Sequence, residues 1–153
     1  MKTSQKVLWI SLFAVSFALV ESAIVVYLRS LYYPEGFSLP LKIMTAQHLG
    51  VELLREAATI VMLAAAGILA GSSRWQRFGY FMMAFGVWDI FYYLWLKAIL
   101  NWPVSIFDWD VLFLVPAPWI GPMIAPVLIS TLMIFSGSLI IRADSPESPF
   151  RPG

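Results

Sequence analysis

The chain has 153 residues, of which 60% are hydrophobic and only 12% are charged, with a formal net charge of +1. Soluble domains carry about twice this share of charged residues, so the composition excludes an ordinary soluble domain and favours an integral membrane protein. The small net charge argues against a nucleic-acid partner, which requires a basic face. With no cysteine, one histidine and no nucleotide-binding motif, we expect neither a haem nor a nucleotide cofactor.

Apolar runs predict an all-α bundle of four membrane-spanning helices. A helix needs about 20 residues to cross a hydrocarbon core about 30 Å thick. The expected spans are 7–28, 49–71, 77–96 and 123–141, within a single transmembrane domain of residues 1–142. The basic start is typical of a signal peptide, but the apolar run continues to Leu28, so we interpret it as a retained span. The proline-containing tail, 143–153, is expected to be disordered and cytoplasmic.

The chain between the third and fourth spans is rich in proline and aromatic residues. Val111–Ile141 contains no charged residue and is too long for one simple span. Prolines, among them Pro116 and Pro118, interrupt its first half. We therefore predict a re-entrant or interfacial segment before the fourth span rather than a fifth span. Irregular backbone at membrane depth must be buried in protein or line a wet cavity.

Basic residues are divided unevenly between the two sides of the membrane. One side carries Lys2, Lys6, Arg74, Arg77, Arg142 and Arg151. The other side carries Arg29, Lys42 and Lys97, together with Asp108 and Asp110. The positive-inside rule then predicts a multi-pass protein of the inner (cytoplasmic) membrane with both termini in the cytoplasm.

Five ionisable residues lie inside or at the edge of the expected spans, and one histidine lies just outside. They are Glu21, Glu52, Arg55, Glu56 and Asp89, with His48. Each charge at a span centre costs about 2.5–3.5 kcal/mol on insertion scales, so scattered charges would be expensive. Glu21, Glu56 and Asp89 are each expected about 9–12 Å below the outer surface, on three different helices. We therefore expect them to form one group.

The spacing of these residues also places them on shared helix faces. His48, Glu52 and Glu56 recur at helical spacing on the second span. Tyr93 lies one turn after Asp89 on the third span, where its hydroxyl can donate to a buried carboxylate. Four carboxylates then face one embedded arginine. A site of low dielectric constant resolves this imbalance by holding protons or by binding a cation.

These patterns predict one polar site in the outer half of the membrane. The candidate residues are Glu21, His48, Glu52, Arg55, Glu56, Asp89 and Tyr93. Carboxylates with one imidazole suit a divalent metal, whose ligands would be Glu21, Glu56, Asp89 and His48. Asp108 and Asp110, in the aromatic loop above, either cap a short interfacial helix or cover the site as a lid.

Two glycines at the end of the second span, Gly67 and Gly71, form a GxxxG pattern that allows close approach of another helix. We interpret it as packing within the chain, with Ser136–Ser138 of the fourth span as a candidate partner. Dimerisation is the alternative interpretation.

Three functional interpretations are open, and in each the lipid bilayer surrounds the protein. In the first, the polar site handles a proton, a cation or a small polar ligand. In the second, the chain is an accessory subunit of a larger membrane complex or a homo-oligomer, and its charges are structural, with Arg55 pairing with Glu56 or Asp89. In the third, it is an intramembrane enzyme that acts on a lipid or isoprenoid by acid–base chemistry or with a bound metal.

Overall fold

The computed structural model describes residues 1–38 and 42–144. Its four helices are α1 (Thr3–Tyr32), α2 (Ala46–Ala70), α3 (Arg74–Leu100) and α4 (Ile124–Ala143). All four are long and apolar enough to cross a membrane, which confirms the predicted fold class of a multi-pass helical bundle. Six helix ends extend the expected spans by two to four residues, and the end of α2 and the start of α4 each fall one residue short of them. Of the tail that was expected to be disordered, residues 145–153 lie outside the described residues.

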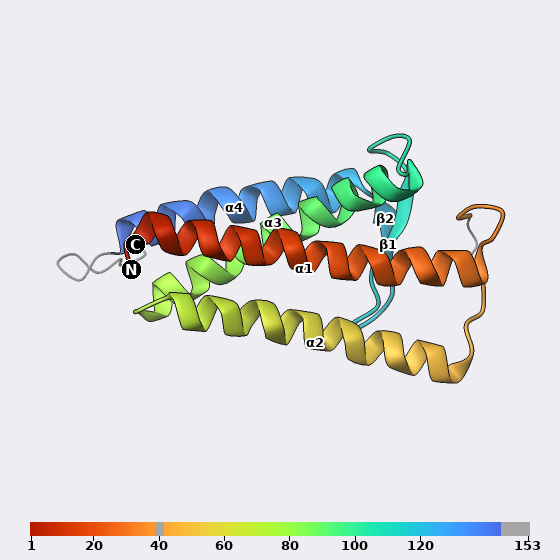
Figure 1. Cartoon of the computed structure of the whole chain (residues 1–153), viewed down its shortest axis with the longest axis horizontal. Coiled ribbons are helices and arrows are strands. Elements are labelled where there is room, and N and C mark those ends of the chain that lie inside the picture. The colour runs from red at the N-terminus through yellow and green to blue at the C-terminus, as the bar shows by residue number, and fades with distance from the viewer. Residues whose placement is uncertain (39–41, 145–153) are drawn as a thin grey trace.

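The helices lie roughly side by side, with both termini at one end of the bundle (Figure 1). We call this the terminal end, and the opposite end, where the connections after α1 and α3 lie, the loop end. Helix α3 is central, because it packs along α1, α2 and α4, whereas α1 and α2 make few direct contacts with each other. Helix α2 is therefore held in the bundle mainly by its packing on α3.

Glycines set how closely the helices approach α3. A Cβ atom built on Gly67 would lie 2.7 Å from the backbone nitrogen of Phe81, so α2 contacts the backbone of α3 at this point. A Cβ atom on Gly137 would lie 2.6 Å from the carbonyl oxygen of Gly79, where α4 meets α3. Packing of the GxxxG pattern within the chain is therefore observed. Its partner is α3, so the expectation that it packs against α4 is wrong.

The proline-rich segment before α4 contains a small hairpin, where the sequence suggested irregular backbone. Strands β1 (Trp109–Phe113) and β2 (Trp119–Pro122) pair antiparallel, with Asp110 opposite Gly121. The aromatic and β-branched residues of β1 favour an extended strand, and the prolines fall in the loop between the strands and at the end of β2. The loop of this hairpin reaches across the bundle to α2 (Figure 1).

Candidate functional site

Helices α1, α2 and α3 and the hairpin enclose a partly open cavity of about 170 Å³ near the loop end. The predicted residues that line it are Glu21, Glu52, Arg55, Glu56, Asp89, Tyr93 and Asp110. His48 and Asp108 are not among the lining residues. The carboxylates of three helices, expected at one depth, thus line the same cavity, but each has a different partner.

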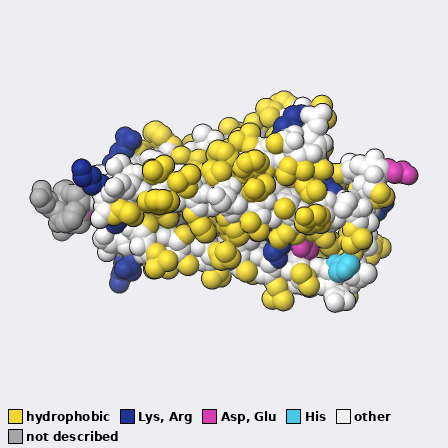
Figure 2. All heavy atoms as spheres, viewed as in Figure 1, with side chains coloured by type: hydrophobic (Ala, Val, Ile, Leu, Met, Phe, Trp, Pro, Cys, Tyr) yellow, Lys and Arg dark blue, Asp and Glu magenta, His cyan; other side chains and the backbone are white. Residues whose placement is uncertain are grey.

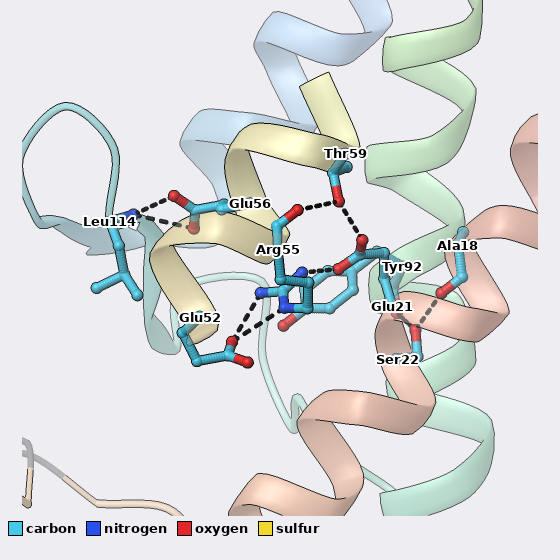
Figure 3. Close-up of polar contacts among 9 residues, drawn as sticks. All are labelled: Ala18, Glu21, Ser22, Glu52, Arg55, Glu56, Thr59, Tyr92 and Leu114. Carbon is cyan, nitrogen blue, oxygen red and sulfur yellow. Dashed lines mark hydrogen bonds and ion pairs between the residues drawn. The ribbon is translucent and has the colours of Figure 1, made fainter. Parts of the chain in front are cut away.

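An ion triad joins α1 to α2 (Figure 3). The guanidinium of Arg55 donates to Oε2 of Glu52 through Nε at 3.0 Å and Nη2 at 2.9 Å. Its Nη1 donates to Glu21 on α1. The hydroxyl of Thr59 contacts the other carboxylate oxygen of Glu21. The expectation that Arg55 pairs with Glu56 or Asp89 is therefore wrong, because its guanidinium is already shared by two other carboxylates.

Backbone groups of the hairpin hold the carboxylate of Glu56. The N–H of Leu114 lies 3.0 and 2.8 Å from the two carboxylate oxygens, and the N–H of Val115 donates at 2.8 Å. Two successive backbone N–H groups form a concave binding site for an anion. Glu56 therefore fixes the hairpin loop against α2 (Figure 3), and residues of β1 line the cavity.

The carboxylate of Asp89 is held by the neighbouring helix instead. The hydroxyl of Ser130 on α4 donates to its Oδ2 at 2.7 Å. This contact depends on the close approach of α3 and α4 at Gly86, where an added Cβ atom would lie 2.5 Å from the carbonyl oxygen of Ser130. The third carboxylate thus links α3 to α4 rather than to a cation.

A second ion pair, between Arg29 and Asp110, lies in the cavity wall. Arg29 Nη2 is 3.2 Å from Oδ1 of Asp110, and both side chains are buried. The guanidinium also lies over the rings of Trp102 and Phe37, with its central carbon 3.8 and 4.4 Å from the ring centroids. Burial raises the pKa of Asp110 to about 6, although Arg29 acts in the opposite direction.

The two loop aspartates have separate roles. Asp110 lies on β1 and lines the cavity. Oδ2 of Asp108 accepts the N–H groups of Val104 and Ser105, at 2.7 and 3.1 Å, and so stabilises the turn that precedes β1.

The charge imbalance of the cavity is smaller than the sequence suggested. Its lining includes five carboxylates and three basic side chains, since Arg29 and Lys42 line it as well as Arg55. Negative groups remain in excess, which disfavours an anionic ligand.

His48 stands apart from the other candidate residues. Its Nδ1 contacts the hydroxyl of Tyr32, and its backbone N–H donates to the capping hydroxyl of Thr45 at 3.2 Å, in the first turn of α2. Within residues 1–38 and 42–144, no group of three or more His, Asp or Glu side chains is arranged to hold a metal ion. The metal ligand set suggested by the sequence, with His48 as its imidazole, is therefore not assembled.

No protein-family model, curated protein or solved structure matches this chain. Its own geometry therefore carries the functional argument. That geometry defines a class, a four-helix membrane protein with a charged cavity between its helices at one end.

Proposed function

We propose that this protein binds a small, membrane-soluble polar ligand in the cavity at the loop end. One observation carries the proposal: a single partly open cavity unites buried charges from three helices with an aromatic wall. Binding sites for small molecules typically combine a mostly apolar lining with a few polar groups that fix orientation. Here Trp88, Tyr92 and Tyr93 of α3 form an aromatic part of the lining.

The burial of the polar face of α2 supports this proposal over an accessory role. Glu52, Glu56 and Thr59 are buried within the bundle. Charges that pair with another subunit would instead be exposed on the surface of the isolated chain. A homo-oligomer or a larger complex would have to form through the apolar faces of the helices.

The membrane orientation is part of the proposal. Basic side chains gather at the terminal end of the bundle (Figure 2), where Lys2, Lys6, Arg74, Arg77 and Arg142 lie. Cytoplasmic loops carry an excess of such residues. The cavity then lies in the outer half of the inner membrane, and both termini are cytoplasmic.

A second candidate is an intramembrane enzyme that acts on a lipid or isoprenoid by acid–base chemistry. The cavity is partly open, and Arg55, which lines it, keeps 20% of its side chain exposed. This supports access of a lipid to the cavity, and turnover of a bound lipid, rather than binding alone, would distinguish the enzyme.

The binding proposal is tested with three small probes of similar size, namely hexan-1-ol, hexylamine and hexanoate. Saturable binding to protein in lipid nanodiscs is measured by calorimetry, with empty nanodiscs to correct for partition into lipid. We expect hexanoate to bind most weakly, because carboxylates outnumber basic groups in the cavity. Absence of saturable binding for all three probes would refute the proposal.

A matched pair of variants locates the bound probe. Val25 lines the cavity, whereas Val51 is 56% exposed on the surface of α2. Val25→Phe fills part of the cavity and should weaken binding about ten-fold or more. Val51→Phe adds the same side chain elsewhere and should leave binding unchanged. Equal affinities of the two variants would place the probe outside the cavity.

A further inference from the structure

Asp89 has weaker support than the other four carboxylates that line the cavity, each of which contacts an arginine or two backbone N–H groups. Its Oδ2 accepts a hydrogen bond from the hydroxyl of Ser130 at 2.7 Å. Within residues 1–38 and 42–144, no basic side chain pairs with Asp89, and its Oδ1 accepts no hydrogen bond. Tyr93, whose hydroxyl the sequence suggested as a donor, is not hydrogen-bonded to it. One uncharged donor therefore stabilises this carboxylate.

The free oxygen of Asp89 remains accessible. In the described part of the chain, the buried side-chain atoms that lack both a hydrogen-bond partner and accessible surface are Trp88 Nε1 and Asp110 Oδ2. Oδ1 of Asp89 is not one of them, so it keeps accessible surface although the residue is only 5% exposed. Because Asp89 is buried in the bundle and lines the cavity, a ligand in the cavity can reach this oxygen.

Aromatic rings surround Asp89 on α3. Tyr92 and Tyr93 follow it by three and four residues, so helix geometry places them beside it on the same face. Their ring centroids are 4.9 Å apart, and the ring of Trp88 packs on that of Tyr92 at 6.4 Å. All three rings line the cavity. The faces of such rings attract cations within about 6 Å.

The chain does not supply a cation for Asp89. The two arginines of the cavity wall already pair with other carboxylates. Lys42 is exposed, and its Nζ lies 5.3 Å from the centroid of the Tyr33 ring. An ionised carboxylate inside a membrane is costly unless a positive charge compensates it. A positively charged ligand would provide this compensation, and a ligand without charge would not.

The lining favours an organic cation over a metal ion. The described residues contain no group of three His, Asp or Glu side chains arranged to hold a metal. The cavity volume of about 170 Å³ is close to that of an engineered cavity, about 150 Å³, that binds benzene. An apolar body of about six carbons therefore fits inside, and a longer tail would leave through the opening.

We propose that the ligand is a lipophilic amine, whose ammonium group binds to the carboxylate of Asp89 and whose apolar body lies against the aromatic rings of α3. This inference rests on the proposed binding function and narrows it to one ligand class.

The test compares hexylamine with hexan-1-ol, in nanodiscs of phosphatidylcholine at neutral pH by calorimetry. The two probes have the same apolar chain, and the amine carries a positive charge at this pH. We expect hexylamine to bind about ten-fold more tightly than the alcohol, because a hydrogen bond to a carboxylate is stronger when its donor is charged.

Two variants locate the charge that the amine recognises. Asp89→Asn removes the negative charge but keeps an oxygen that can accept from Ser130. Binding of hexylamine should weaken about ten-fold in this variant, while the affinity for hexan-1-ol should hardly change. Glu35→Gln removes a carboxylate from an exposed loop position and is the matched control. It should keep the preference of the wild-type protein for the amine.

The outcomes separate this inference from the proposed function. If neither probe binds saturably, both fail. If the probes bind but the wild-type protein does not prefer the amine, the inference is wrong and the binding function stands. The same holds if Asp89→Asn keeps the full preference for the amine. The comparison of amine with alcohol needs only the wild-type protein, so it can overturn the inference even if Asp89→Asn does not fold.

Discussion

Three carboxylates that share one cavity are stabilised in three different ways. Glu21 contacts an arginine, Glu56 accepts backbone N–H groups, and Asp89 accepts a hydroxyl. These donors come from α2, from the hairpin and from α4, so each carboxylate joins a different pair of elements. Their structural roles are therefore not interchangeable, although all three have the same functional group.

Asp110 should make the protein less stable as the pH rises. Its pKa is raised from 3.8 to about 6, so between these values the folded state binds a proton more readily than the unfolded state does. The contribution to stability is complete below pH 4 and is lost as the pH rises to about 6. Asp110→Asn should remove this loss, which is on the order of 2–3 kcal/mol. Denaturant titrations of the wild-type protein and of Asp110→Asn at pH 4 to 7 give the unfolding free energies that measure this loss.

The control for this prediction is Glu35→Gln, which removes a carboxylate from an exposed loop position. This variant should keep the pH dependence of the wild-type protein. The same slope in wild type and Asp110→Asn would show that Asp110 does not titrate as its burial indicates.

Residue spacing and depth were enough to anticipate which carboxylates lie together, but not what they contact. Glu21, Glu56 and Asp89 line one cavity because helix geometry fixes both their height and their face. Their donors depend on tertiary packing: Ser130 reaches Asp89 because α3 and α4 meet closely. His48 was expected to lie with these carboxylates. It lies instead in the first turn of α2, where its ring contacts the hydroxyl of Tyr32 at the end of α1. That the cavity is the functional site stays a prediction.

Among the elements, the hairpin shows the limit of sequence patterns most clearly. Most residues of Trp109–Phe113 are aromatic or β-branched, which favours a strand. The nearby prolines at 116 and 118 favoured irregular backbone instead, so the strand was not predicted. A proline in a hairpin loop does not disturb the ladder on either side of it. The four helices, by contrast, were predictable because a long apolar run has few alternatives to a span.

The glycines of α2 provide a matched pair for testing helix contact. Gly67→Ala should destabilise the bundle by about 1–3 kcal/mol, because its Cβ would lie 2.8 Å from the carbonyl oxygen of Arg77 as well as against Phe81. A Cβ atom added at Gly50 would have no neighbouring atom within 4 Å. Gly50→Ala should therefore be neutral or should stabilise the bundle by up to about 1 kcal/mol. Denaturant titrations of both variants in micelles measure the difference. Equal effects would mean that α2 does not pack closely on α3.

At the scale of the molecule, the absence of cysteine from the sequence makes the topology simple to test. Glu35→Cys places the only thiol at the loop end, and Arg74→Cys places it at the first residue of α3, at the terminal end. In spheroplasts, a membrane-impermeant maleimide should label Glu35→Cys directly and Arg74→Cys only after permeabilisation. The reverse pattern would place the cavity in the cytoplasmic half of the membrane.

Composition determined the membrane class, but the arrangement of the helices required the structure. Apolar runs do not show which helix is central, and α3 takes this place because small residues let its neighbours approach its backbone. The separation of α1 from α2, which makes room for the cavity, follows from that arrangement.

The distribution of hydrogen-bond partners along the chain also has a consequence for biosynthesis. Glu21 is synthesised 34 residues before Arg55, Asp89 41 residues before Ser130, and Glu56 58 residues before Leu114. At about 5–20 residues per second, each carboxylate waits roughly 2–12 s for its partner. Each span that carries one must therefore leave the ribosome before its charge is compensated. Docking of the hairpin onto α2 is therefore a late step of assembly, and until it occurs the carboxylate of Glu56 lacks its backbone N–H donors.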